Sequence, residues 1–165
     1  MGIGEILDDT IESWRRERPD LDFDGMALFL RMSAVVRSTV GEFRNDVEEM
    51  GITLSEFDVL ATLRRSGPKV ALTPSYIAHV AMVKPSGLAH RLARLENAGL
   101  ITRTPDPEDG RGALIRITPT GRRVVDRAIE LLAERKNQVF GVLTDRQRES
   151  LVSLLDRVIR TGDVV

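Results

Sequence analysis

The chain has 165 residues, 42% of them hydrophobic, which is enough for one compact domain with its own core. Its formal net charge of −1 does not indicate a non-specific nucleic-acid binder, and no apolar run approaches the roughly 20 residues that span a bilayer. Because cysteine is absent, disulfides, thiolate catalysis and cysteine zinc sites are excluded, and the acidic start without a signal-peptide core favours a cytoplasmic protein.

The first fifty residues are expected to form two helices. Apolar residues recur at helical spacing from Ile3 to Trp14, and Pro19 ends this short amphipathic helix. A longer helix is expected from about Gly25 to Glu49, with Gly51 as its stop. The apolar seam of the second helix consists of Val36, Val40, Phe43 and Val47.

Two shorter helices should follow. Thr53 and Glu56 have the spacing of a capping box, and they open a third helix that ends at the Ser66-Gly67-Pro68 break. Thr73 followed by Pro74 suits an N-cap with proline at the first helical position, so a fourth helix of about two turns should end near Met82.

A fifth helix and a β-hairpin come next. Pro85 should lie in the first turn of the fifth helix, which stops at Gly99. The β-prone runs 101–103 and 113–117 predict a hairpin. Pro105, Pro107 and Gly110 separate the two runs and form its tip.

Two more helices complete the chain. Thr118 and Pro119 repeat the cap-plus-proline signal and start a helix that continues to about Leu143. Thr144 and Gln147 form a second capping box, which opens the last helix. The apolar seam of that helix consists of Leu151, Leu154, Leu155 and Val158.

The fifth helix carries the chemistry. Leu88, Leu92 and Leu95 fall on one face and should point to the core. The opposite face is short, polar and cationic, and such a face fits a major groove, where arginine bonds guanine and residues at the helix start reach phosphates. It comprises Ser86, His90, Arg94 and Asn97, with Gly87 and Arg91 on the flank. Basic residues outnumber acidic ones by eight to four between Lys84 and Arg123, although an unevenly charged solvated surface also has this property.

The hairpin tip supports the same interpretation. Arg111 lies between Gly110 and Gly112, so a long cation at an exposed turn can enter the narrow minor groove. Asp109 is expected to brace this loop or to hold the arginine stem. A turn whose charges are merely solvated is the alternative.

Together these motifs resemble the MarR family of bacterial regulators. The resemblance rests on Leu72-Thr-Pro, the turn from Leu95 to Leu100, Asp109-x-Arg111, and Ile117-Thr-Pro-Thr-Gly121. It implies a mainly α fold with a small β-hairpin wing, formed by a winged helix-turn-helix lobe and terminal dimerisation helices. The implied boundaries are 1–50 and 119–165 for the dimerisation helices and 53–118 for the DNA-binding lobe. It further implies a homodimer that binds double-stranded DNA at successive major grooves of a pseudo-palindrome, and a small-molecule cleft.

Carried over by position, the recognition helix of the family corresponds to residues 85–97, and its wing-tip arginine corresponds to Arg111. Two departures from the family affect the expected DNA contacts: the base readout at positions 89 and 90 should differ, and Lys84 is a poorer N-cap that is expected to contact phosphate instead. Ala89-His90 stands where Thr-Arg is common, and Lys84 stands where the helix usually starts with serine or threonine. The expected DNA-binding residues are Lys84, Pro85, Ser86, Gly87, His90, Arg91, Arg94 and Arg111.

The terminal helices and several apolar residues have further possible roles. The terminal helices carry apolar faces. These faces are buried either by self-association of two chains or by packing within one chain. An apolar effector cleft is expected from Trp14, Met26, Phe29, Met32 and Phe57, although such residues are more often core. No catalytic motif, metal site or cofactor motif is present, because His79 and His90 lack a ligand pattern and 106–109 is only a fragment of a calcium loop. We therefore expect a dimeric repressor and not an enzyme, with a winged-helix protein-interaction module as the alternative.

Overall fold

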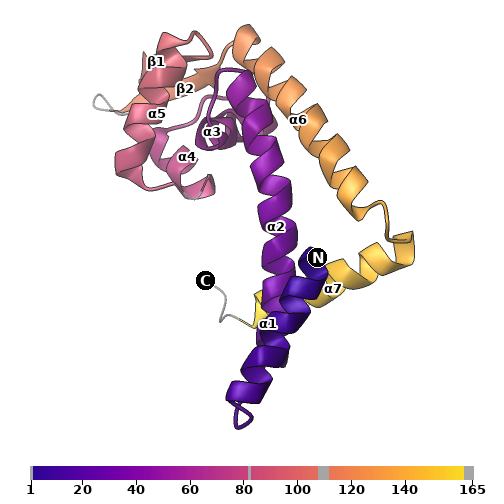
Figure 1. The fold of residues 1–165 in the computed structure, drawn as a ribbon. Coiled ribbons are helices and arrows are strands. Elements are labelled where there is room, and N and C mark those ends of the chain that lie inside the picture. The colour runs from indigo at the N-terminus through magenta and orange to yellow at the C-terminus, as the bar shows by residue number, and fades with distance from the viewer. Residues whose placement is uncertain (1, 82, 108–111, 162–165) are drawn as a thin grey trace. The chain divides into compact units, whose positions relative to one another are not determined.

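The structure is a computed structural model that describes residues 2–81, 83–107 and 112–161, with the side chains of residues 85 and 86 left out. The described residues form seven helices and a two-stranded antiparallel hairpin (Figure 1). In chain order these elements are α1 (Ile3–Glu17), α2 (Asp24–Glu49), α3 (Leu54–Arg65), α4 (Pro74–Val80), α5 (Pro85–Asn97), β1 (Ile101–Pro105), β2 (Ala113–Ile117), α6 (Pro119–Phe140) and α7 (Asp145–Arg160). The predicted fold class is confirmed.

Four threonines set the starts of four helices. Thr53, Thr73, Thr118 and Thr144 each accept a hydrogen bond from the backbone amide three residues later, at 3.0 to 3.3 Å. Such a bond satisfies one of the amides that have no partner in the first turn of a helix. The predicted caps are therefore confirmed, because capping depends on residues within one turn of each other.

The chain divides into two compact units, residues 1–42 and 43–165. In the first unit, Ile11 and Phe23 are buried, and the Trp14 ring stacks on that of Phe23 at 6.2 Å. Arg15 pairs with Asp24 at 2.7 Å across the turn between α1 and α2. These contacts hold the two helices of this unit together.

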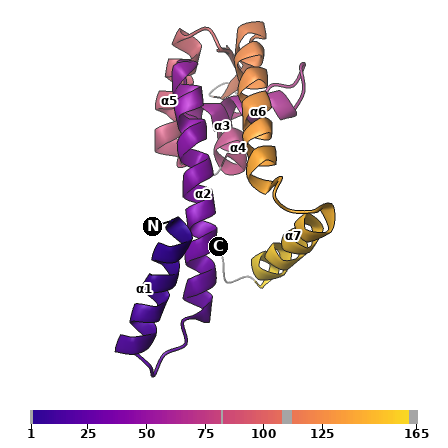
Figure 2. The ribbon, with the colours of Figure 1, turned by 45° about the vertical axis from the view of Figure 1, so that its right-hand side comes forward.

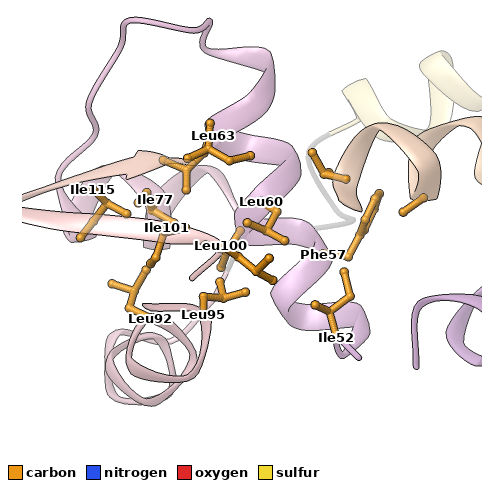
Figure 3. Close-up of a cluster of buried hydrophobic side chains, with 14 of the residues drawn as sticks. Ile52, Phe57, Leu60, Leu63, Ile77, Leu92, Leu95, Leu100, Ile101 and Ile115 are labelled. Atoms are coloured by element: carbon orange, nitrogen blue, oxygen red, sulfur yellow. The ribbon is translucent and has the colours of Figure 1, made fainter. Parts of the chain in front are cut away.

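The second unit contains the winged helix-turn-helix lobe, whose core lies between α3, α4, α5 and the hairpin (Figure 3). Leu92 and Leu95 point from α5 towards the hairpin and α3, and with Leu88 they are almost fully buried. Each such side chain contributes about 1.5–3 kcal/mol by leaving water. The predicted core face of the fifth helix is confirmed.

The core of this unit extends beyond residues 53–118. Phe43 lies near the end of α2, and its ring packs edge-on against Phe57 at 4.9 Å. Val125 and Ala128 of α6 are also buried in this core. The lobe therefore includes the last turns of α2 and the first half of α6.

The hairpin pairs Ile101 with Ile117 and Pro105 with Ala113. Leu72 exchanges two backbone hydrogen bonds with Ile115, at 2.9 and 3.0 Å, and so ties the α3–α4 connection to β2. Pro105 was expected in the loop, but it is the last residue of β1. An edge strand tolerates proline because its outward N–H needs no partner in the sheet.

Beyond the lobe, α6 runs away from the hairpin and α7 turns back from its far end (Figures 1 and 2). Arg135 of α6 pairs with Asp46 of α2 at 2.5 Å, and Asp46 is largely buried. No residue of α7 is buried among those that the structure describes. Within the described ranges, no helix has both the length and the apolarity needed to span a membrane.

Candidate nucleic-acid interface

The outward face of α5 follows from the burial of its opposite face. Since Leu88, Leu92 and Leu95 are buried, residues half a turn away must face solvent. Ala89 and His90 are exposed there, and Ala93 continues the same face one turn later. The exposed surface of α5 thus consists of small side chains, with the imidazole of His90 near its middle.

Lys84 is the N-cap of α5 and is exposed. Its side chain makes no capping hydrogen bond, as the sequence predicted for a poor N-cap residue. The positive end of the helix dipole therefore carries an additional cation, an arrangement that favours a bound anion. Gly87, one turn further on, is half-buried.

Arg91 turns towards α3. Its Nη1 atom is buried and has no hydrogen-bond partner among the described residues. The guanidinium lines a cavity of about 400 Å³ together with Asp58, Lys84 and Gly87. Burial raises the pKa of the Asp58 carboxyl, whereas the charges of Arg91 and Arg65 lower it. Arg91 thus lies on the flank of α5, where the sequence placed it.

Arg94 also contacts α3. Its Nε lies 3.0 Å from Oε1 of Glu56, a residue that is only 2% exposed, while the Arg94 side chain is 51% exposed. Oε2 of Glu56 accepts hydrogen bonds from the amide and the hydroxyl of Thr53, at 2.8 and 3.0 Å. The predicted capping box is therefore also one half of an ion pair between α3 and α5.

The wing is described only in part. Arg111 and Asp109, the predicted wing-tip cation and its brace, lie outside the described residues. At the base of the loop, the amide of Asp106 donates to the carbonyl of Gly112 at 3.1 Å. Arg116 of β2 donates to the backbone carbonyl of Lys69 at 2.5 Å, which adds a second tie between the hairpin and the α3–α4 connection.

The residues of the expected effector cleft have two different environments. Trp14, Met26, Phe29 and Met32 belong to the first unit and are exposed. Phe29 and Met32 line one groove on α2, which has a volume of about 530 Å³. Phe57 is a core residue of the second unit, which is the packing role that the sequence left open.

Sequence reasoning missed two acidic residues beside the predicted interface. Glu56 was identified only as a cap, and Asp58 was not singled out. Both lie on α3, more than thirty residues before the arginines beside them. The single available signal was the position of Glu56 in a capping box, and this says nothing about distant partners. Among the described residues, no group of three or more histidines or acidic residues is arranged to hold a metal ion.

Comparison with known proteins gives consistent results. Residues 50–112 match the model of the MarR family. The HTH-type transcriptional regulator PecS of Dickeya dadantii (strain 3937) is 34% identical over 152 residues, which are 92% of each chain. An HTH-type transcriptional repressor of Mycobacterium bovis is 28% identical over 131 residues, covering 79% of this chain and 90% of the relative.

The fold comparison agrees with the sequence comparison. A crystal structure of a mutant MarR from E. coli complexed with operator DNA superposes with a TM-score of 0.69 at 25% identity. The match covers 82% of this chain and 96% of that one. The chain therefore belongs to the MarR family of transcriptional regulators, as its motifs predicted.

Proposed function

We propose that this protein is a sequence-specific DNA-binding repressor that binds a pseudo-palindromic operator as a homodimer. The observation that carries the proposal is the division of α5 into two faces. Its apolar face is fully buried, while Lys84 and His90 are exposed. The fold also matches a MarR protein that was crystallised on operator DNA. A helix with this division of faces can enter a major groove without exposing core residues.

In the proposed complex, the start of α5 approaches the DNA backbone and its middle faces the bases. Lys84 contacts a phosphate, and His90 reaches base edges. Arg111 enters the minor groove from the wing, with Asp109 bracing the loop. The excess of basic residues between Lys84 and Arg123 supports an electrostatic contribution from this part of the chain.

Dimerisation is proposed from the apolar surface of the terminal helices. Leu154 of α7 is 55% exposed, and Val158, one turn later, is exposed as well. Ile3 and Ile6 of α1 are likewise exposed. A second copy of the chain would cover these side chains, and its twofold axis would match a palindromic site.

A small apolar or aromatic effector is proposed to regulate binding. The groove on α2 supports this proposal, because Phe29 is 66% exposed and lies beside Met32. Trp14 and Met26 complete the proposed effector-binding residues, and Phe57 is left out because it belongs to the core. An effector that prefers the dimer geometry unsuited to DNA would weaken binding by about 1–3 kcal/mol.

Selection of bound duplexes from a random pool, followed by salt titration, tests the proposal. We expect one enriched pseudo-palindrome, and an association constant that falls log-linearly with salt by about 0.9 per neutralised phosphate. Arg111→Ala should weaken binding to all sequences, whereas His90→Ala should change the preferred sequence. A protein-interaction module of the same fold would enrich no duplex at physiological salt, and that result would refute the proposal.

A further inference from the structure

Glu56 is an unusual residue for a DNA-binding lobe because its carboxylate is buried. Only 2% of the residue is exposed, and it is one of three buried polar or charged residues in the part of the chain that the structure describes. A buried carboxylate is costly unless donors surround it. Thr53 provides two of these donors and Arg94 provides the opposite charge.

The Glu56–Arg94 ion pair restrains α5 in a way that its apolar contacts do not. Burial of leucines favours any arrangement that keeps their area from water, because the hydrophobic effect is not directional. The ion pair acts between two particular atoms, because Nε of Arg94 lies 3.0 Å from Oε1 of Glu56. Since Thr53 fixes the carboxylate at the start of α3, the pair fixes the rotation of α5 about its axis.

Arg94 cannot turn towards DNA without cost. If its guanidinium left Glu56 to bond a guanine, a carboxylate that is almost fully buried would lose its countercharge. Arg91 is not placed to substitute for it, because its Nη1 is buried in the cavity beside Asp58. Arg94 thus pairs with α3, and Arg91 lines a cavity beside the same helix.

We infer that Arg94 is a positioning residue that holds α5 through Glu56, and that His90 determines base preference. This inference rests on the proposed function. His90 precedes Arg94 by one helical turn, so both residues lie on the same side of α5. Holding Arg94 therefore fixes the direction in which the exposed imidazole points. Ala89 and Ala93 leave room around it and offer only methyl groups, which suit the methyl group of thymine.

The test compares variants of the full chain by duplex selection and by affinity for the selected duplex. We expect Glu56→Gln and Arg94→Gln each to weaken binding by about tenfold without changing the order of preferred bases. The double variant should be no weaker than either single variant, because both remove the same interaction. Arg94→Lys should keep most of the wild-type affinity. Lysine retains the positive charge that pairs with Glu56, but it lacks the paired N–H donors with which arginine binds guanine.

Salt dependence gives a readout that separates positioning from a phosphate contact. The slope of log affinity against log salt should be the same for Arg94→Gln and the wild type, because Arg94 neutralises no phosphate. His90→Ala is the contrasting variant, and it should change the selected sequence. Circular dichroism melts show whether each variant is folded, and Arg94→Lys provides a variant that keeps the buried charge paired.

Three results would overturn the inference. One is a changed base preference in Arg94→Gln that Glu56→Gln does not share. The second is an additive loss in the double variant, and the third is a salt slope reduced by about one unit in Arg94→Gln. A wild-type protein that selects no duplex would instead refute the proposed function, and the inference with it.

Discussion

Replacing Gly121 with alanine tests how closely α6 approaches the hairpin. A Cβ atom at this position would lie 2.1 Å from the carbonyl oxygen of Leu100 and 3.0 Å from a side-chain carbon of Ile117. The carbonyl is not free to move, because it accepts a hydrogen bond from the amide of Thr118 at 3.0 Å. The hydroxyl of Thr118 also donates to the carbonyl of Gly99 at 2.8 Å.

The expected magnitude follows from two opposing effects. In an unconstrained helix, alanine is more stable than glycine by up to about 1 kcal/mol. Here the methyl group would overlap a backbone oxygen by more than about 1 Å, relative to ordinary van der Waals contact. Overpacking costs about 1–3 kcal/mol where side chains adjust, and more where the backbone must move. We therefore expect Gly121→Ala to destabilise the protein by at least about 2 kcal/mol.

Urea unfolding at a fixed protein concentration measures this difference. Gly41→Ala is the matched control, because Gly41 is also helical and a Cβ atom there meets nothing among the described residues within 4 Å. This control should be as stable as the wild type or more stable. If Gly121→Ala left the urea midpoint unchanged or raised it, as expected for Gly41→Ala, the close approach of α6 to Leu100 would be refuted.

Three other substitutions test separate features. Leu154→Glu, in the exposed apolar seam of α7, should yield monomers in analytical ultracentrifugation. Ser153→Glu, on the side of the helix opposite the seam, should leave the dimer intact. Equal sedimentation of the two variants would contradict the proposed dimer interface. Thr73→Ala removes the cap on Tyr76 N and should cost about 1 kcal/mol in urea unfolding, and no loss would contradict the cap. Burial raises the pKa of the Asp58 carboxyl above its usual value of 3.8. The contribution of this carboxyl to stability is therefore fully present below pH 3.8, and it is lost as the pH rises through the raised pKa. Asp58→Asn should gain stability relative to the wild type over this interval, and a pH-independent difference would contradict the shift.

The helices and their starts were predictable because their signals are local, whereas α6 ends at Phe140 and not near Leu143. A threonine cap such as Thr118 and the proline after it act within one turn, and the structure confirms them. The core face of α5 was predictable for the same reason, since its leucines repeat with the period of the helix. Pro105 was placed wrongly because proline was taken as a loop signal, whereas the end of an edge strand tolerates it.

The partners of charged residues were not predictable, because they depend on distant parts of the chain. Arg91 and Arg94 have the same type of side chain on one helix, and their spacing alone assigned both to DNA. The structure brings Arg94 to Glu56 and lines the cavity beside Arg91 with Asp58. The excess of basic residues in this segment therefore overstates the charge available to phosphates, because α3 already neutralises part of it. If α5 binds DNA as proposed, its small residues and the imidazole of His90 are the groups left to discriminate between sequences.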